Sequence, residues 1–557
     1  MELSELVSDL LSKRGITTPE DVGTFLNPDY DLHTHNPFLL EGMDRAVARL
    51  FAAFDANERI AVYADFDCDG IPGAALLSDF LKKIGHENFE VYLPHRDREG
   101  YGFHQEAITQ LASRGVSLII TVDVGTTALE SVAHAKSLGV DVIVTDHHEI
   151  TGPLPEALAV INPKLGDYPF RDLCGAATAF KLAQATLIEG RKREAPRFKE
   201  IVVGWEKWLL DMVAIATVAD MVPLVGENRV LARFGLKVLS KTQRPGLQAL
   251  FTRLRLRRAE LTEDDVGFLI GPRINAASRM GEPDLAFKLL TTQDAIEAES
   301  IAAELERLNT RRKGIVATVV RQAKKSVNQR FKKEERVVVL GNPEWKPAIL
   351  GLAANSIMED RGGVVCLWGR DANGNLKGSC RSDGSVSIAE LFANSNEILE
   401  QYGGHAHSGG FSVSHENVHG LPEGFALAAA GLSQVATQEN DGSYDALASL
   451  SEVSSRLFGE VSRLAPFGIG NPKPVFQVCD VIITNVRRFG KDSSHIEVNL
   501  ECRRSGARVR AFDFFRSPEG FAHTPEAGKE AKVLATIERD MFRGGLVLRL
   551  VDILKSA

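Results

Sequence analysis

Short apolar runs alternate with longer helix-like segments between residues 59 and 144, and this alternation limits the fold more than any other feature of the chain. The apolar runs occupy residues 60–64, 89–93, 118–122 and 140–144, and the helix-like segments occupy residues 73–84, 105–114 and 128–138. Strands that alternate with helices of this length form βαβ units around a mostly parallel sheet that helices cover on both faces. The sequence therefore predicts an α/β domain.

Residues with carboxylate or imidazole side chains stand at the ends of three of these runs. They are Asp65, Asp67 and Asp69 after the first run, Asp123 after the third, and Asp146, His147 and His148 after the fourth. Because parallel strands place their carboxyl ends at one edge of a sheet, we expect these side chains to converge. Converging carboxylates repel one another unless a cation neutralises them. Carboxylates joined by one or two imidazoles favour Mn²⁺ or Mg²⁺ over a thiolate-bound zinc.

The pattern D-x-D-x-D-G at residues 65–70 has two other interpretations. It also opens an EF-hand calcium loop, but the twelfth position of such a loop needs a bidentate Glu and is Leu76 here. A solvated acidic turn is the second alternative. Asp220 supports the metal site, because it ends an apolar helix predicted over residues 209–218, where an unpaired acid is costly.

Four motifs occur in order along the chain: D-F-D-C-D-G at 65–70, V-D-V-G at 122–125, D-H-H at 146–148 and A-D-M-V-P at 219–223. They resemble the successive motifs of the DHH phosphoesterase superfamily, and within it those of the RecJ family of single-strand-specific exonucleases. Residues 271–279 (G-P-R-I-N-A-A-S-R) are similar to a further RecJ motif, residues 402–410 (Y-G-G-H-A-H-S-G-G) to the Gly-Gly-His motif of the DHHA1 domain, and residues 467–476 (F-G-I-G-N-P-K-P-V-F) to the start of the RecJ OB-fold.

The predicted fold class is α/β multidomain: a parallel-sheet DHH domain, a long connecting helix, a smaller α/β DHHA1 domain and a C-terminal OB-fold β-barrel. The expected divisions are an N-terminal appendage (1–57), the DHH domain (58–240), a helical region (241–334), the DHHA1 domain (335–435) and the OB-fold (455–557). A segment with one glycine and many charged residues predicts the connecting helix over residues 292–329. Five short alternating strands between residues 478 and 551 predict the barrel.

Composition limits the compartment and the partners. Six cysteines stand singly without a C-x-x-C pair, which argues against a disulfide framework and a structural zinc site. No apolar run reaches membrane-spanning length and the N-terminus lacks a signal peptide, so we expect a cytoplasmic protein. The net charge of -9 argues against nucleic-acid binding by bulk attraction. Basic runs, among them residues 324–333 and 487–491, can act locally, although most such runs are solvated faces.

A two-metal phosphodiesterase needs a bridging carboxylate and terminal ligands on each side. We expect Asp123 to bridge, since it ends a strand in the middle of the sheet. The expected terminal ligands are Asp67 and His147 on one ion, and Asp69 and Asp220 on the other. Asp65, Asp146 and His148 are expected at the edge of this shell or just behind it, with His148 contacting the scissile phosphate.

The resemblance implies an enzyme that releases 5′-mononucleotides from the 5′ end of single-stranded DNA with two Mn²⁺ or Mg²⁺ ions, in DNA repair and recombination. The expected substrate contacts are Arg96, Ser379 and Arg381 around the terminal phosphate, Tyr101 stacked on the first bases, and Arg273, Asn275, Arg279, Gly404 and His405 from the motifs. Phe489, Phe512, Phe514 and Phe515, among Arg487, Arg488, Lys491 and Arg510, are candidates for stacking on bases. We expect a monomer, with a single-strand-binding protein and a recombination helicase as candidate partners.

Two other functions fit part of the pattern. One is a DHH phosphoesterase for short oligoribonucleotides or cyclic dinucleotides, but those relatives usually lack an OB-fold. The other is a non-catalytic scaffold resembling the replication factor Cdc45, in which metal ligands have decayed. Every expected ligand is present in this chain, which favours the enzyme.

Overall fold

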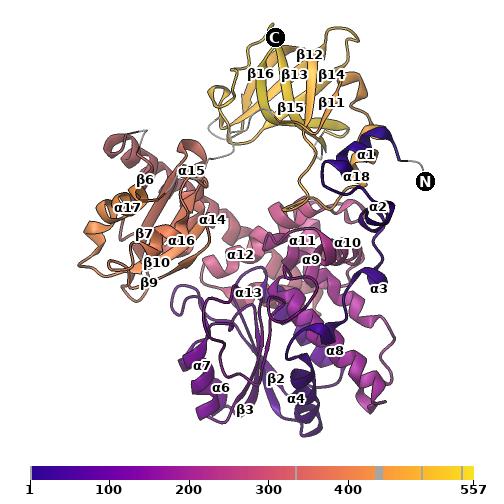
Figure 1. Cartoon of the computed structure of the whole chain (residues 1–557), viewed down its shortest axis with the longest axis vertical. Helices are drawn as coiled ribbons and strands as arrows, with labels where there is room; N and C mark the ends of the chain where they lie inside the picture. Colours follow the sequence, from indigo (N-terminus) through magenta and orange to yellow (C-terminus); the bar gives the residue numbers. More distant parts are fainter. Residues whose placement is uncertain (1–2, 333–334, 433–442, 491–492, 541–542, 557) are drawn as a thin grey trace. The chain divides into compact units, whose positions relative to one another are not determined.

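The computed structural model describes residues 3–332, 335–432, 443–490, 493–540 and 543–556. The chain divides into two compact units (Figure 1). The first comprises Met1–Thr34, Pro223–Arg233 and Gln438–Ala557, and the second comprises His35–Val222 and Phe234–Thr437. No helix in the described ranges is long and apolar enough to cross a membrane.

A five-stranded parallel sheet forms the centre of the DHH part of the second unit, as predicted. Its order is β2 (Phe89–Tyr92), β1 (Arg59–Ala64), β3 (Val116–Val122), β4 (Asp141–Thr145) and β5 (Ala159–Ile161). Helices α4 (Met43–Asp55), α5 (Gly70–Lys83) and α8 (Gly175–Lys192) cover one face, and α6 (Gln105–Ser113) and α7 (Leu129–Ser137) cover the other (Figure 1). Burial on both faces explains why the strands are almost continuously apolar.

A group of helices completes this part of the unit. They are α9 (Leu210–Ala219), the part of α10 (Gly226–Ser240) from Phe234 onward, α11 (Pro245–Leu254), α12 (Gly271–Arg279) and α13 (Pro283–Thr291), with a π-helical segment over Asp265–Ile270. Arg244 links two of the helices that lead to the sheet edge: its guanidinium lies 2.7 Å from a carboxylate oxygen of Asp211 on α9 and 2.5 Å from one of Asp79 on α5. One buried cation therefore fixes α5 against α9.

We expect Arg244→Ala to lower the stability of the second unit strongly. The substitution leaves the carboxylates of Asp79 and Asp211 buried without their cation, a loss of about 3–5 kcal/mol. Thermal unfolding followed by circular dichroism measures the change. The matched control is Arg253→Ala, which removes a more exposed ion pair with Glu299 and should cost less than about 1 kcal/mol. Equal, small losses in both variants would contradict the structural role of Arg244.

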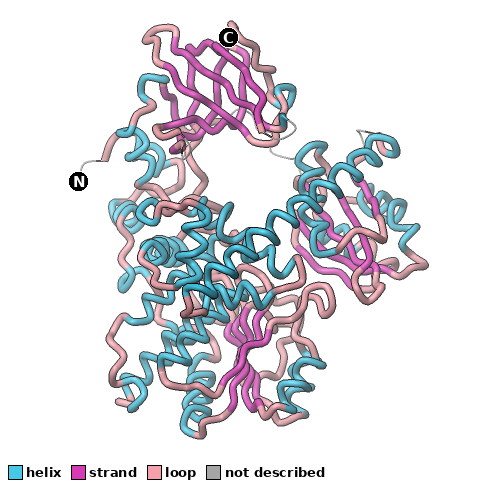
Figure 2. Tube along the Cα trace, turned by 180° about the vertical axis from the view of Figure 1, so that it is seen from behind, coloured by secondary structure: helices cyan, strands magenta, loops and turns pink. Residues whose placement is uncertain are grey.

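The predicted connecting helix is α14 (Ala295–Arg330), and its C-terminal half is part of the DHHA1 core. The DHHA1 sheet has the order β6 (Val337–Gly341), β7 (Val364–Arg370), β8 (Leu376–Ser382), β10 (Ser408–Val413) and β9 (Gln401–Gly404). Strands β6 and β7 are parallel and the other neighbours are antiparallel. Figure 2 shows the strands of the chain in magenta. Helices α14 and α15 (Pro347–Arg361) pack on one face, and α16 (Ile388–Ala393) and α17 (Leu421–Ala430) on the other.

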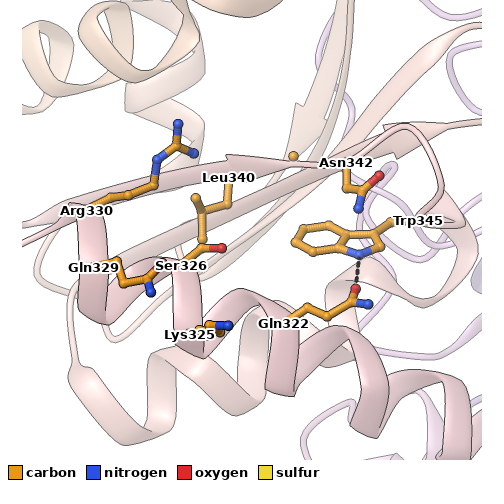
Figure 3. Close-up of a pocket in the computed structure, with 9 residues that line it drawn as sticks. Gln322, Lys325, Ser326, Gln329, Arg330, Leu340, Asn342 and Trp345 are labelled. Carbon is orange, nitrogen blue, oxygen red and sulfur yellow. Dashed lines mark hydrogen bonds between the residues drawn. The ribbon is translucent and has the colours of Figure 1, made fainter.

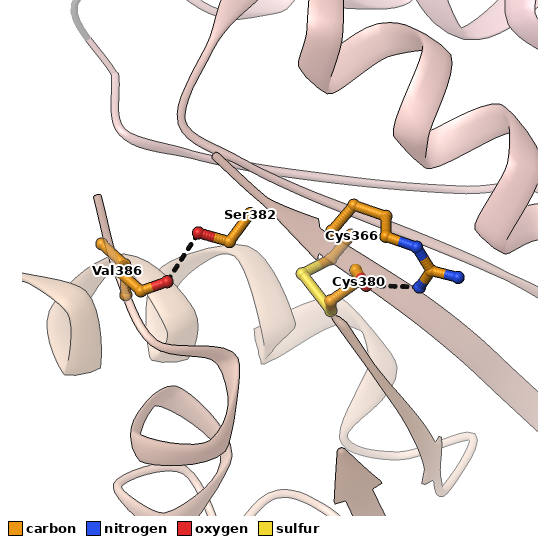
Figure 4. Close-up of a disulfide and its surroundings, with 5 residues drawn as sticks. Cys366, Cys380, Ser382 and Val386 are labelled. Atoms are coloured by element: carbon orange, nitrogen blue, oxygen red, sulfur yellow. Dashed lines mark hydrogen bonds between the residues drawn. A yellow bond between two sulfur atoms is a disulfide. The ribbon is translucent and has the colours of Figure 1, made fainter. Parts of the chain in front are cut away.

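A disulfide joins two strands of this sheet, which differs from the prediction that the cysteines stay single. Cys366 of β7 lies directly opposite Cys380 of β8, and their sulfur atoms are bonded (Figure 4). At the end of β8, two residues after Cys380, the hydroxyl of Ser382 donates to the carbonyl of Val386 at 2.6 Å. The pairing follows from the register of two antiparallel strands, which the spacing of the cysteines in the sequence does not show.

The first unit contains the predicted barrel. Its strands are β11 (Ala446–Ala448), β12 (Phe476–Phe489), β13 (His495–Cys502), β14 (Arg508–Asp513), β16 (Leu546–Lys555) and β15 (Glu530–Arg539) in spatial order, and pairing of β12 with β15 closes the barrel. Helix α18 (Ser455–Ser462) lies between β11 and β12 in the sequence and belongs to this unit.

The sequence predicted one N-terminal appendage over residues 1–57, but the structure divides these residues between the two units. Helices α1 (Glu5–Ser12), α2 (Pro19–Leu26) and α3 (Tyr30–His33) belong to the first unit, whereas α4 packs on α8 in the second. Buried Arg229 explains the first association, because its guanidinium donates to the carbonyl groups of Phe25, Ala465 and Pro466. The other predicted domain boundaries stay predictions.

Candidate metal centre

The acidic residues and histidines at the sheet edge converge, as the strand order requires. Three groups of side chains each bring their potential ligand atoms within 4.8 Å of one another. The groups are Asp65, Asp67 and Asp123; Asp69, His147 and Asp220; and Asp123, His147 and His148. The loops after β1, β3 and β4 supply all of these residues except Asp220, which follows the last turn of α9.

Asp123 lies where the groups meet. It belongs to two of them, and its Oδ1 is 3.2 Å from Nε2 of His147. Its backbone has a left-handed φ of 62° and its N–H donates to the carbonyl of Thr145 at 2.9 Å. A left-handed conformation costs a residue with a Cβ about 1–2 kcal/mol. Buried Oδ1 has no hydrogen-bond partner among the described residues, so the strained loop holds an oxygen ready for a cation.

The start of α8 is a part of the site that sequence analysis missed. The carboxylate of Asp69 accepts hydrogen bonds from the N–H groups of Gly175 at 2.6 Å and Ala176 at 2.7 Å. A Cβ at Gly175 would lie 2.6 Å from Cβ of Asp123, so only glycine lets the helix approach this closely. The one signal in the sequence was a glycine before a run of small residues, which carries no side-chain chemistry.

The acidic loop after β1 folds back on itself. Oδ1 of Asp67 accepts from the N–H groups of Asp69 at 2.8 Å and Gly70 at 3.2 Å, and a Cβ at Gly70 would lie 2.2 Å from the carbonyl oxygen of Asp65. Asn275 supports the loop, because its Oδ1 accepts from the N–H of Cys68 at 3.1 Å. The structure thus places Asn275 against the backbone of the metal-ligand loop.

Asp146 positions the two histidines. Its carboxylate accepts from the N–H of Thr126 at 2.9 Å, the N–H of His147 at 2.8 Å and Nδ1 of His148 at 2.7 Å. Burial acts to raise its pKa, but these hydrogen bonds and the charge of His148 hold the pKa well below its usual range. Asp146 is in none of the three groups formed by the described residues, so it lies behind them.

The pKa values of the two histidines shift in opposite directions. Burial and the charge of neighbouring His148 lower the pKa of His147 to about 4, so it is a neutral imidazole at pH 7, the form that binds a metal. Burial opposes the charge of His148, but its hydrogen bond to Asp146 raises its pKa above the ordinary value. The D-H-H motif thus contains one imidazole that is neutral at pH 7 and one whose protonated form is favoured by its hydrogen bond to Asp146.

The carboxylates need a cation. Burial and repulsion from Asp67 raise the pKa of Asp69 to about 7, and burial and repulsion from Asp69 raise that of Asp220 to about 9. Burial raises the pKa values of Asp65 and Asp123 well above their ordinary range. A dication removes these costs, and the set of oxygens with one neutral imidazole fits Mn²⁺ or Mg²⁺.

One part of the expected ligand arrangement differs from the structure. The sequence paired His147 with Asp67, but Nε2 of His147 lies 3.6 Å from an oxygen of Asp69 and 3.6 Å from an oxygen of Asp220. Asp65, expected at the edge, joins Asp67 and Asp123. The loop after β4 therefore directs His147 toward the starts of α5 and α8 and the end of α9.

Four guanidinium groups form a second cluster in the same unit. Burial, followed by the charges of Arg96, Arg312 and Arg381, lowers the pKa of Arg279. Arg279 donates to the carbonyl of Ala348 at 2.6 Å. Arg381 donates to its neighbouring carbonyl at Cys380, and Arg96 lies 4.6 Å from the ring centre of Phe66 in the metal-ligand loop. Sequence analysis missed Arg312, because one face of a 36-residue charged helix gives no sign of what it approaches.

The other predicted substrate residues lie in three places: beside the metal-ligand groups, on the DHHA1 sheet, and between α12 and α14. The hydroxyl of Tyr101 lies 3.3 Å from the carbonyl oxygen of Asp123 and 3.3 Å from Nδ1 of His148. Ser379 lies two residues before Arg381 on β8, and Gly404 and His405 are in the β9–β10 hairpin. Arg273 is separate: its guanidinium is bound by Glu306 at 2.8 Å and by the carbonyl of Leu269, so it joins α12 to α14.

Three known domain families match successive parts of the chain. Residues 59–217 match the DHH family, N-terminal domain; residues 334–424 match the DHHA1 domain; and residues 444–551 match the RecJ OB domain. The chain is 30% identical over 528 residues to the single-stranded-DNA-specific exonuclease RecJ of Haemophilus influenzae, covering 93% of this chain and 91% of that one.

The chain belongs to the RecJ family. It is also 34% identical over 507 residues to RecJ of Bacillus subtilis, covering 90% of this chain and 62% of that relative, so it spans less than two thirds of the length of that protein. The crystal structure of RecJ in complex with Mn²⁺ from Thermus thermophilus has a TM-score of 0.81 and 27% identity, covering 100% of this chain and 76% of that one.

The RecJ OB domain of this chain exposes aromatic residues, and two of the predicted cations near them are paired with a carboxylate. Phe514 is 40% exposed and Phe515 is 79% exposed. In a simple basic groove these arginines would be unpaired, but Arg487 and Arg510 each lie 3.0 Å from a carboxylate oxygen of Glu497. Lys491 is outside the described residues. Stacking thus has more support in this barrel than attraction by unpaired charge.

Mn²⁺ binding to the RecJ-family centre should release protons, and its affinity should rise between pH 6 and pH 8.5. The pKa values of Asp69 and Asp220 are raised to about 7 and about 9 in the metal-free folded chain, so both carboxyls hold protons at pH 6 and lose them to bind a dication. Calorimetry in two buffers with different ionisation enthalpies counts the protons. Asp220→Asn should reduce their number. Binding without proton release would contradict these pKa values.

Proposed function

We propose that this RecJ-family chain is an exodeoxyribonuclease that digests single-stranded DNA from the 5′ end by two-metal hydrolysis and releases 5′-mononucleotides. The observation that carries the proposal is the meeting of two ligand groups at Asp123. The printed names of the relatives, single-stranded-DNA-specific exonucleases, support the substrate class. The residues that match the RecJ OB domain favour long single strands over short oligoribonucleotides or cyclic dinucleotides.

The ligand groups suggest how two ions would be held. Asp65, Asp67 and Asp123 would hold one ion, and Asp69, His147 and Asp220 the other. Asp123 would serve the second ion too, because its Oδ1 lies 3.2 Å from Nε2 of His147. Bound Mn²⁺ or Mg²⁺ supplies activation of water at neutral pH and stabilisation of the charge that develops on the phosphate. The RecJ structure from Thermus thermophilus, which holds Mn²⁺, supports this choice of ions.

The residues of the chain do the rest of the chemistry. The 2.7 Å hydrogen bond between Nδ1 of His148 and the carboxylate of Asp146 favours the protonated form of His148. The other ring nitrogen of His148 can then donate a hydrogen bond to the scissile phosphate and a proton to the departing 3′ oxygen. Tyr101, beside His148 and 52% exposed, is placed to stack on the terminal base.

Asp123→Ala should abolish cleavage with either metal, while the fold is kept. The variant loses the carboxylate that both ions share, so we expect kcat to fall below about a tenth of the wild-type value, and several kcal/mol of transition-state stabilisation to be lost. A time course on 5′-labelled single-stranded DNA measures kcat, and circular dichroism checks the fold. Glu130→Ala, an acid in the first turn of α7, is the control. A variant with more than a tenth of wild-type kcat would refute the bridging role.

The guanidinium cluster supports recognition of the 5′ end. A terminal phosphate is a dianion, and planar guanidinium groups bind it with paired donors. Arg96 and Arg279 belong to the DHH part, and Arg381, with Ser379 two residues before it, belongs to the DHHA1 sheet. Within the second unit these residues can hold the end of the strand while the metal-ligand loop holds the next phosphodiester, which gives 5′-to-3′ polarity.

Arg381→Ala should remove the preference for a 5′-phosphorylated strand over a 5′-hydroxyl strand. The loss of one charge-assisted hydrogen bond should cost roughly 1.5–3 kcal/mol on the phosphorylated substrate alone. The measurement is kcat/KM on both substrates. Arg370→Ala, a cation on the neighbouring strand β7 that lies 3.9 Å from Glu344, is the matched control. If the ratio of the two kcat/KM values does not change in Arg381→Ala, another residue recognises the end.

Roles in DNA repair and recombination follow from such an activity, because both processes resect strands. A single-strand-binding protein and a recombination helicase remain predicted partners, and a monomer the predicted state.

A further inference from the structure

A pocket of about 390 Å³ lies outside the metal centre, between the last turns of α14 and the end of β6 (Figure 3). It is lined by Gln322, Lys325, Ser326, Gln329, Arg330, Leu340, Gly341, Asn342 and Trp345. β6 and β7 are parallel and α15 follows β6, so the pocket stands at the carboxyl end of a strand. Open α/β sheets bind ligands at this position.

The polar side of the pocket is one face of α14. Lys325 and Ser326 lie three and four residues after Gln322, and four and three residues before Gln329, and these helical spacings place the four side chains on one face. A different face of this part of the helix carries Val319, Ala323 and Val327 into the DHHA1 core. The packed core fixes the helix, so the polar face has a defined position beside β6.

The lining contains two cations and no carboxylate. Lys325 and Arg330 have no acidic partner within the described ranges, whereas the neighbouring Lys324 is bound to Asp360 and does not line the pocket. Two unpaired cations at the same pocket attract an anion. Lys325 and Arg330 of α14 are therefore candidates for binding an anion, and not only part of a solvated face.

The amide groups add donors. Nε1 of Trp345 donates to Oε1 of Gln322 at 2.8 Å (Figure 3). Oδ1 of Asn342 accepts from the N–H of Glu344 at 2.9 Å. Since both amide oxygens are engaged, the NH₂ groups of Gln322 and Asn342 stay available as donors. Leu340 and Trp345 supply an apolar wall. The pocket thus combines cations, amide donors and an apolar surface.

We propose that this pocket binds a nucleoside 5′-monophosphate. Lys325 and Arg330 match the phosphate dianion, the amides match the polar edge of a base, and the volume is in the range of small-ligand sites, about 300–1,000 Å³. The choice of nucleotide rests on the proposed function, because a 5′-mononucleotide is its product. The site would hold this product apart from the metal centre.

The test is dAMP binding to metal-free protein, measured by calorimetry after the chelator has been dialysed away. Lys325→Ala and Arg330→Ala should each weaken binding at least about tenfold, the effect expected from a lost charge-assisted hydrogen bond. Lys324→Ala, one residue away and outside the pocket, should leave the Kd unchanged. The affected residues are exposed, and circular dichroism checks that the variants fold.

Three results would overturn the proposal. The first is a Kd for dAMP that is the same in wild type, Lys325→Ala and Arg330→Ala, and the second is no dAMP binding at all. The third is binding of an oligothymidylate that depends on Lys325, without binding of dAMP, which would assign the pocket to the DNA strand. Because no cleavage is measured, a failure here is distinct from a failure of the proposed exonuclease activity.

Discussion

Repulsion among carboxylates at one edge of a parallel sheet is the constraint on which the second unit depends. Asp65, Asp69 and Asp123 are almost fully buried there, and their raised pKa values express the cost. The fold offsets part of it with backbone donors, of which the start of α8 is the clearest example. It also fixes the helices behind the ligands with the buried cation Arg244. What remains uncompensated is the charge that a pair of dications would neutralise.

Two neighbouring histidines show how one carboxylate sets different roles. Asp146 accepts from Nδ1 of His148 and from the backbone N–H of His147. The hydrogen bond to Asp146 raises the pKa of His148, while burial and the charge of His148 lower the pKa of His147. Adjacent residues of the same type thus differ in the protonation state that their surroundings favour.

Much of the fold and site could be predicted because periodicity and motif order determine them. The alternation of strands and helices fixed the parallel order of β1, β3 and β4, and that order brought their terminal acids together. The parts that were missed depend on backbone or long-range contacts. The N–H groups at Gly175 carry no residue-type signal, Arg312 depends on which face of α14 meets Arg279, and Cys366 meets Cys380 only through strand register.

The central claim is that Asp123 joins two ions into one centre. Electron paramagnetic resonance of the wild-type chain loaded with Mn²⁺ tests it directly, because ions bridged by one carboxylate, about 3.5–4 Å apart in two-metal sites, are magnetically coupled. The account predicts two Mn²⁺ per chain with a coupled spectrum that Asp123→Asn converts to an uncoupled one. Uncoupled spectra at full loading of the wild type, or saturation at one ion, would contradict it.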